Sequence, residues 1–406
     1  MTDRRTPTGL AAYREVLRTP GAAAFCSAGA LARLPMGMLG LGAVLMVVGL
    51  GGSYTLAGSV AAGSAIAQGV GAPQVSRLTD RFGQTRVLLP QLTVTGAALA
   101  AFILAGLARA PGWVLIVIAV VVGLSTPQIG SLTRVRWTLL LAERPGHDTA
   151  LAIEGLIDEL AFIFGPVLVS LLATLVAPVA GVAAALLITV VGTLLFVAQR
   201  RTEPPPAGSR SGKREPGGVL GALIHPGQQV LVAVFLGLGA VFGLIEVALV
   251  GFAHEQGRPG SSGLLIGLWS TGSLIAGIVY GGMAWVVPAR RRLLAAVAGF
   301  AAGAALIWAG GATVGTLTIA LLVAGLANAP ALIAGTSVVA AAVPESAATE
   351  AYTWLNVALF AGSAAGAPVA GWLVDRSGSS AALLGAAVTA AATLGVTALG
   401  YRRLPE

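Results

Sequence analysis

Charged residues are scarce in this sequence, and cysteine and histidine are scarcer still. Only 10% of the 406 residues are charged, and there are one cysteine and three histidines. A single cysteine, Cys26, excludes a disulfide framework and a thiolate metal site. His147, His225 and His254 are all predicted to lie in loops, and no glycine-rich phosphate loop followed by Lys-Ser/Thr occurs. We therefore expect no metal centre, no cofactor, no direct ATP hydrolysis and no enzymatic activity.

Hydrophobic residues, in contrast, make up 56% of the chain, and the mean hydropathy is +0.88. A soluble protein of this length could not bury that much apolar surface. The apolar runs are solid rather than alternating, which favours helices over a barrel. We predict an all-α polytopic membrane protein with twelve transmembrane helices, at roughly 22–49, 54–75, 87–108, 112–134, 149–176, 178–198, 228–253, 262–284, 292–311, 313–341, 350–374 and 379–400.

The basic residues predict the orientation of these spans. With both termini in the cytoplasm, the cytoplasmic segments hold 20 Lys and Arg, Arg134 and Arg136 among them, and the outer segments hold three, Arg109, Arg258 and Arg376. This bias is typical of the cytoplasmic side. The net charge of +8 then indicates topology and an affinity for anionic membrane lipids, not nucleic-acid binding. The composition suggests a GC-rich bacterial genome, and hence the bacterial inner membrane.

The two halves of the sequence resemble each other weakly. Leu-Arg-Thr-Pro-Gly at 17–21 resembles Leu-Ile-His-Pro-Gly at 223–227, and Gly165-Pro166-Val167 is matched by Ala367-Pro368-Val369, 202 positions later. Six apolar runs lie on either side of a polar segment rich in Pro, Gly, Ser and charge. We predict two pseudo-symmetric six-helix bundles, residues 1–199 and 219–406, joined by a cytoplasmic linker at 200–218. We expect the protein to be a monomer.

Between the second and third spans lies Ser76-Arg-Leu-Thr-Asp-Arg-Phe-Gly-Gln-Thr-Arg86. It resembles the cytoplasmic signature loop of the major facilitator superfamily, Gly-x-Leu-x-Asp-Arg-x-Gly-Arg-Lys. The residues that carry the resemblance, with the flanking basic residues, are Arg77, Leu78, Asp80, Arg81, Gly83 and Arg86. Ser76 departs from the family's glycine. Gly165-Pro166 is similar to a motif of the drug/proton antiporter branch, whereas the arginine which that branch carries in its fourth helix is absent from 121–131.

The resemblance implies a transporter whose two bundles rock around a central site. Asp80 ends the second span, and Gly83 permits a tight reversal. A carboxylate at this point could accept hydrogen bonds from the N-terminus of the eleventh helix when the bundles close on the cytoplasmic side. Alternatively, Arg77, Asp80 and Arg81 form an ordinary solvated loop.

The fifth span, 149–176, carries three carboxylates within six residues, Glu154, Asp158 and Glu159. Acidic residues inside a membrane helix cost about 2.5–3.5 kcal/mol, so they require partners or water. At 100° per residue, Glu154 and Asp158 share a stripe with Gly165, whereas Glu159 shares a second stripe with Pro166. The segment therefore has two polar faces.

The depths of these residues predict which of them pair. At 1.5 Å per residue, Arg33 lies about 18 Å from the cytoplasmic face, Asp158 and Glu159 about 14–15 Å and Glu154 about 8 Å. We expect Arg33 to reach Asp158 or Glu159 but not Glu154, which we place at the cytoplasmic rim. The pair could be purely structural, or the second carboxylate could bind and release protons. The two roles could coexist, with one carboxylate paired to Arg33 and the other titrating, and the sequence does not assign the roles to particular carboxylates.

Other polar residues are weaker candidates. Glu246, near the outer face in the seventh span, is a second proton candidate or simply an interfacial acid. The side chains that could line a central cavity, or merely tie helices together, are Gln128, Asn328, Trp354 and Asn356. Trp269 is expected to be a packing residue. Pro35, Pro127 and Pro330 could break their helices.

Carboxylates without another ion-ligand cluster favour protons as the coupling ion. We expect a proton-coupled exporter of small amphipathic or apolar organic molecules that works by alternating access. A proton-coupled uptake permease for a small metabolite would use the same carboxylates, with an anionic substrate paired to Arg33. A membrane sensor without transport activity is disfavoured by the short loops.

Overall fold

The structure is a computed structural model that describes residues 10–141, 146–206, 226–281, 283, 285–342 and 345–404, without the side chains of residues 10–12, 80, 147–148, 340–342 and 345–350. Its described residues form helices and no strands. Arg210, Lys213 and Arg214 of the predicted linker lie outside the described residues, as does Arg144.

The N-terminal bundle contains six spans, which follow the short helix α1 (Leu10–Leu17). They are α2 (Ala22–Gly49), α3 (Tyr54–Phe82), α4 (Gln84–Leu107), the pair α5 (Gly112–Ser125) and α6 (Ile129–Leu140), α7 (His147–Leu175) and α8 (Ala180–Ala198). The short 3-10 helix η1 (Arg200–Thr202) follows the last of them.

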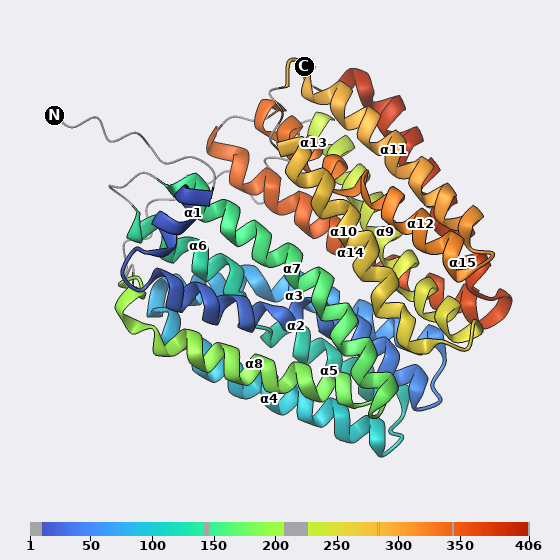
Figure 1. Ribbon diagram of the computed structural model, residues 1–406, viewed down its shortest axis with the longest axis horizontal. Helices are drawn as coiled ribbons and strands as arrows, with labels where there is room; N and C mark the ends of the chain where they lie inside the picture. Colours follow the sequence, from blue (N-terminus) through green and yellow to red (C-terminus); the bar gives the residue numbers. More distant parts are fainter. Residues whose placement is uncertain are drawn as a thin grey trace.

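The C-terminal bundle repeats this plan. It contains α9 (Pro226–Glu255), α10 (Ser262–Gly281) after the short η3 (Pro259–Ser261), α11 (Ala289–Gly310), the pair α12 (Val314–Gly325) and α13 (Asn328–Ala342), α14 (Glu345–Ser377) and α15 (Ser379–Gly400). The 3-10 helix η4 (Tyr401–Arg403) ends the described chain. In Figure 1 the first bundle runs from blue to green and the second from yellow to red.

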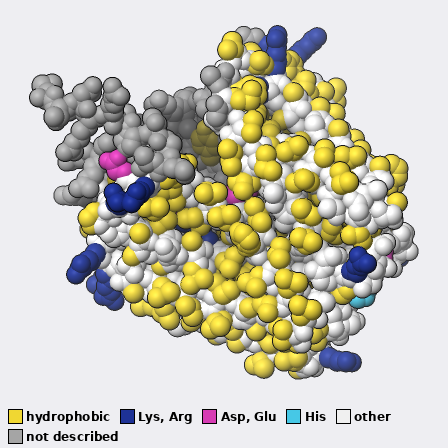
Figure 2. Space-filling model, viewed as in Figure 1, with side chains coloured by type: hydrophobic (Ala, Val, Ile, Leu, Met, Phe, Trp, Pro, Cys, Tyr) yellow, Lys and Arg dark blue, Asp and Glu magenta, His cyan; other side chains and the backbone are white. Residues whose placement is uncertain are grey.

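Eleven of these spans are long and apolar enough to cross a membrane. The remaining one, α3, has 29 residues but is less apolar, because Gly, Ser and Gln are frequent along it and its last two turns carry Arg77, Asp80 and Arg81. With α3, the described residues form about twelve spans in two bundles, so the fold-class prediction is confirmed. Figure 2 agrees with a membrane protein, because hydrophobic side chains cover the visible face and most basic ones lie at its edges.

Both bundles interrupt their fourth span at equivalent places. Helix α5 ends at Ser125 and α6 starts at Ile129, with Pro127 between them; α12 ends at Gly325 and α13 starts at Asn328, just before Pro330. The breaks lie about 200 residues apart, as the sequence repeat predicts. The third expected break is wrong, because α2 continues as an α-helix through Pro35.

An even number of spans brings both ends of the helical body to one side of the molecule. We call this side, with the start of α2 and the end of α15, the near end, and the opposite side the far end. The bundles meet along α3 with α14 and along α7 with α10, as Figure 1 shows for α7 and α10. Close backbone contacts at Gly58, Gly263 and Gly371 place much of this contact toward the far end.

Candidate transport site

A buried charge cluster links α2, α6 and α7 inside the N-terminal bundle. Arg33, only 3% exposed, forms an ion pair with Glu154 and donates to Asp158 Oδ1 at 2.9 Å and to Thr133 Oγ1 at 2.8 Å. Glu154 is fully buried and also accepts hydrogen bonds from Thr133 Oγ1 at 2.5 Å and Trp137 Nε1 at 2.7 Å. Every charge in this cluster is therefore matched by several donors or acceptors.

The structure corrects the expected position of Glu154. It is not a rim residue, and it pairs directly with Arg33. The sequence-based depth compared Cα positions along separate helices and left out the length of the arginine side chain. In a helix such a side chain leans toward the N-terminus, so the Arg33 guanidinium lies closer to the near end than its Cα and reaches the level of Glu154.

A second base, Arg134, joins the same cluster. Its Nη2 atom donates to Asp158 Oδ2 at 2.7 Å, opposite the oxygen that Arg33 binds. Arg33 is therefore not the only base that pairs with these acids, because Arg134, counted in the sequence with the cytoplasmic basic residues, lies inside α6, which continues through Leu140. Arg33 and Arg134 together neutralise Glu154 and Asp158.

Arg136, also counted with the cytoplasmic basic residues, is fully buried at the near end of the same bundle. It donates to Gln84 Oε1 at 2.8 Å and to the Gln199 carbonyl at 2.9 Å, and its guanidinium lies 3.9 Å from the ring centre of Phe196. These contacts tie α6 to α4 and to the end of α8. They stabilise the bundle and involve none of the predicted transport residues.

Glu159 lies on the other polar face of α7. Positions 159, 163, 166 and 170 form one helical stripe, and the last three of them contact α10. A Cβ on Gly263 would lie 1.9 Å from the Pro166 carbonyl oxygen, and a Cβ on Gly267 would lie 3.1 Å from the Ile163 carbonyl oxygen. Ser170 Oγ lies 3.1 Å from Ser262 Oγ. Glu159 continues this stripe by one turn toward the near end. Half-buried, it has no hydrogen bond or ion pair with any residue that the structure describes.

Glu246 on α9 faces the other bundle. Its Oε1 lies 3.1 Å from the position that a Cβ on Gly40 of α2 would occupy. Within the described part of the chain, Glu246 has no ion pair or hydrogen-bond partner either. Glu246, and Glu159 by its position on the helical stripe, therefore lie where the bundles meet.

The uncharged candidates lie at different places. Gln128 lies in the α5–α6 break and donates to the Thr126 carbonyl at 3.2 Å. Asn328 begins α13 and donates to Ser273 Oγ at 3.2 Å, which leaves its buried Oδ1 without a partner among the described residues. On α14, Trp354 is half-buried and Asn356 is exposed. Trp269 is a packing residue, as expected, buried edge-on against Phe242.

The signature motif is helical up to its glycine. Residues 76–82 form the last turns of α3, and Gly83, at φ 93°, makes the reversal into α4, as the sequence predicted. Glu203 then accepts from the Thr85 N–H at 2.7 Å. Arg77 contacts Gln74, the Arg81 guanidinium lies over Phe82, and Arg86 is exposed. The Asp80 side chain and the first side chains of α14 lie outside the described residues.

The residue that sequence reasoning missed is Asp375, at the far end of α14. Its two oxygens accept hydrogen bonds from the N–H groups of Tyr54 and Thr55 at 2.9 and 2.8 Å and from Thr55 Oγ1 at 2.6 Å. One bundle thus caps the N-terminus of α3 in the other. The signal was present, because Leu-x-Asp-Arg-x-Gly occurs at 78–83 and again at 373–378, with Gly378 at φ 82°.

Gly165-Pro166 lies inside α7, which continues through the proline. A Cβ on Gly165 would lie 2.8 Å from the Gly37 carbonyl carbon, so this glycine permits the close approach of α7 to α2. Pro166, one residue further, faces α10. The motif therefore lets α7 pack closely against α2 of its own bundle and against α10 of the other bundle.

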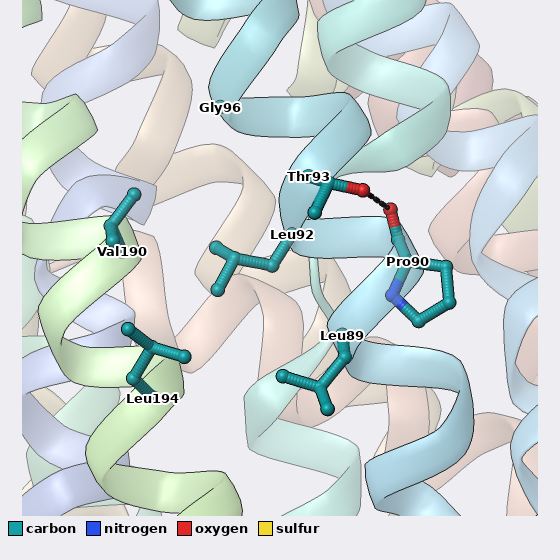
Figure 3. Close-up of a pocket in the computed structure, with 7 residues that line it drawn as sticks. All are labelled: Leu89, Pro90, Leu92, Thr93, Gly96, Val190 and Leu194. Carbon is teal, nitrogen blue, oxygen red and sulfur yellow. Dashed lines mark hydrogen bonds between the residues drawn. The ribbon is translucent and has the colours of Figure 1, made fainter.

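Two apolar hollows adjoin the N-terminal bundle. The larger, about 650 Å³, lies between α4 and α8, and its one polar side chain, Thr93, donates to the Pro90 carbonyl (Figure 3). It contains none of the predicted transport residues. The smaller, about 120 Å³, lies between α2 and α7 and is lined by Ala30, Leu31, Leu34, Ile157, Leu160, Ala161 and Phe164. It is next to the charge cluster along both helices.

About twelve spans in two similar bundles are the architecture of many membrane transport proteins. Comparison with protein families supports this class: the Major Facilitator Superfamily model matches residues 25–257 and 239–406. The chain therefore belongs to the major facilitator superfamily, whose transporters are not enzymes. The antiporter branch expected from Gly165-Pro166 is not established by this match. Curated protein sequences contain no significant match to the chain.

Solved structures of transporters have the same fold. A crystal structure of the nucleoside transporter NupG is 14% identical, with a TM-score of 0.74 over 94% of this chain and 98% of that one. A POT family transporter in complex with 5-aminolevulinic acid is 13% identical, with a TM-score of 0.68 over 94% and 95%. The human organic anion transporter MFSD10 is 17% identical, with a TM-score of 0.58 over 95% and 99%. At these identities the similarity concerns the fold.

Proposed function

We propose that the protein is a proton-coupled secondary transporter that exports small amphipathic or apolar organic molecules, with Glu159 as its principal proton carrier. The observation that carries this proposal is the contrast between the acidic residues of α7. Glu154 and Asp158 are neutralised by Arg33 and Arg134, whereas Glu159 pairs with none of the described residues and lies on the stripe that meets α10.

In this mechanism, protonation of Glu159 decides how readily the bundles close around it. A charged carboxylate is costly to enclose between apolar helices, and a protonated one costs much less. Release of the proton toward one side would favour the state that is open to that side. Glu246, nearer the far end, would serve as a second acidic site as the proton leaves or enters.

The charge cluster also bears on the substrate. Arg33 is the basic residue that an anionic substrate would need, and it is occupied by Glu154, Asp158 and Thr133. Carboxylates without partners and an adjoining apolar hollow favour a neutral or cationic molecule with apolar surface. For such substrates we propose export, from a bacterial inner membrane with the near end in the cytoplasm.

The second candidate is uptake of a small metabolite by proton symport, and the similarity in fold to a nucleoside transporter supports a small metabolite as the substrate. Its test is the direction of coupling. In proteoliposomes with a pH-sensitive dye inside, export by exchange moves protons against the substrate flux, whereas uptake by symport moves them with it. A ligand-induced thermal-shift screen on the purified protein would first select the compounds.

Glu159→Gln tests the coupling. We expect the variant to equilibrate substrate across the membrane but to lose accumulation driven by a pH gradient, because the glutamine cannot carry a proton. Asp158→Asn is the control, because Asp158 is a neighbouring carboxylate that is already paired. This variant should be less stable but should keep its proton coupling. Proton-driven accumulation that persists in both Glu159→Gln and Glu246→Gln would contradict the mechanism.

A further inference from the structure

A cluster of arginines and aromatic rings occupies the near end of the C-terminal bundle. The Arg292 guanidinium lies 5.3 Å from the Trp285 ring centre and 5.8 Å from that of Tyr280, and it donates to the Tyr280 hydroxyl at 3.2 Å. Trp285 is held in turn by a hydrogen bond of 2.9 Å to the Tyr280 carbonyl. Stacking fixes the plane of the guanidinium and leaves its N–H edge available for an anion.

The end of the chain adds further positive charge at this position. The Arg290 guanidinium lies 5.2 Å from the ring centre of Tyr401, which η4 places directly before Arg402 and Arg403. Among the residues that the structure describes, no acidic side chain pairs with Arg291, Arg292, Arg402 or Arg403. The Nε of Arg292 is buried without a hydrogen-bond partner there. A partner for this cluster must therefore be negatively charged.

The neighbouring segment shows that such a partner also has an apolar part. Val286 is 97% exposed, and Met283 and Val287 are exposed as well, directly before the arginines of α11. Exposed aliphatic side chains beside stacked Trp, Tyr and Arg are typical of the level at which lipid headgroups meet acyl chains. A soluble acidic protein or a free anion would offer no acyl chain to cover these exposed aliphatic side chains.

We propose that this α11–η4 cluster binds the headgroup of an anionic phospholipid. The phosphate would accept hydrogen bonds from the N–H edge of Arg292, and an acyl chain would lie along Val286 and Val287. This inference does not depend on the transport direction or on the coupling ion. The end of the N-terminal bundle also carries two arginines, Arg200 and Arg201, but among the described residues neither stacks on an aromatic ring.

The test is lipid retention by the purified full-length protein. We would exchange detergent in the presence of equal amounts of phosphatidylglycerol and phosphatidylcholine and count bound lipids by native mass spectrometry. An Arg that contacts the bound headgroup contributes about fivefold to its binding. We therefore expect Arg292→Gln/Arg402→Gln to retain phosphatidylglycerol about thirtyfold more weakly. Arg200→Gln/Arg201→Gln, at the near end of the other bundle, is the control of equal charge and should retain it as the wild type does.

A second variant, Val286→Ser, guards against misfolding, because this side chain contacts almost nothing. It should weaken phosphatidylglycerol retention without changing the thermal stability. Equal losses in the arginine variant and its control would overturn the proposal, and so would equal retention of phosphatidylcholine by the wild type. Displacement of the lipid by inorganic phosphate would show a site for free anions and would also overturn it.

Discussion

At the scale of single residues, the acidic side chains of α7 divide into two kinds. Glu154 and Asp158 are bound by arginines, and Glu159 is not. A buried ion pair contributes little net stability, but breaking one is expensive because it leaves an uncompensated charge. The same substitution, Glu to Gln, should therefore lower the stability at position 154 and leave it almost unchanged at position 159.

For Glu154→Gln we expect a loss of stability of about 3–5 kcal/mol, since Arg33 would lose its fully buried counter-charge and keep only Asp158, which it shares with Arg134. The measurement is thermal unfolding in detergent, followed by the yield of monodisperse protein. Glu159→Gln is the matched control and should stay within about 0.5 kcal/mol of the wild type, because no contact is lost.

The double variant Arg33→Gln/Glu154→Gln sharpens this comparison. Since each single change leaves a buried charge that the double change removes, the double variant should be less destabilised than the sum of the two single variants. Strict additivity would mean that the two side chains do not interact in the folded protein.

At the scale of helices, a cap contributed by the other bundle holds the start of α3. Asp375 of α14 accepts the N–H groups of Tyr54 and Thr55, which are the unpaired donors of that helix. The contact exists only while the bundles meet at the far end. Within the C-terminal bundle, Glu255 caps α15 in the same way through the Ser379 N–H and hydroxyl.

Asp375→Ala should therefore shift the equilibrium away from the far-end-closed state. A lost cap costs about 0.5–2 kcal/mol, which corresponds to about 2–30-fold in population. Spin labels on Ala108→Cys and Gln256→Cys, in a Cys26→Ser background, would report the distance across the far end. Glu255→Ala removes a cap inside one bundle, and a matching shift in that variant would refute the role of Asp375.

At the scale of the whole molecule, glycines at two kinds of interface allow helices to touch. A Cβ on Gly263 would lie 1.9 Å from the Pro166 carbonyl oxygen in the other bundle, and a Cβ on Gly239 would lie 1.9 Å from the Leu359 carbonyl oxygen in the same bundle. The two clashes are equally severe. Only the first can be relieved by moving the bundles apart.

We therefore expect Gly263→Val to fold in normal yield but to populate the far-end-closed state poorly and to transport slowly. Gly239→Val should instead reduce the yield of folded protein, because no rocking motion removes its clash. Size-exclusion chromatography and the same spin-label pair distinguish these outcomes. Equal losses of yield would show that the contact at Gly263 is a permanent part of the fold.

The sequence by itself determined the twelve-span, two-bundle body. Long apolar runs must form helices in lipid, since every backbone group has to be paired within its own segment. The repeat at an offset of 202 predicted the two bundles, and Gly83 predicted the turn between α3 and α4. These features depend on the chemistry of residues that are adjacent in the sequence.

Only the tertiary structure decided how the charged side chains are paired. The partner of Glu154 is 121 residues away, and Asp375 caps a helix more than 300 residues away. Sequence spacing gives the face of a helix but neither its tilt nor the reach of a long arginine side chain. Arg134 was counted with the cytoplasmic basic residues at the end of the predicted span 112–134, whereas in the folded bundle it lies inside α6 and pairs with Asp158.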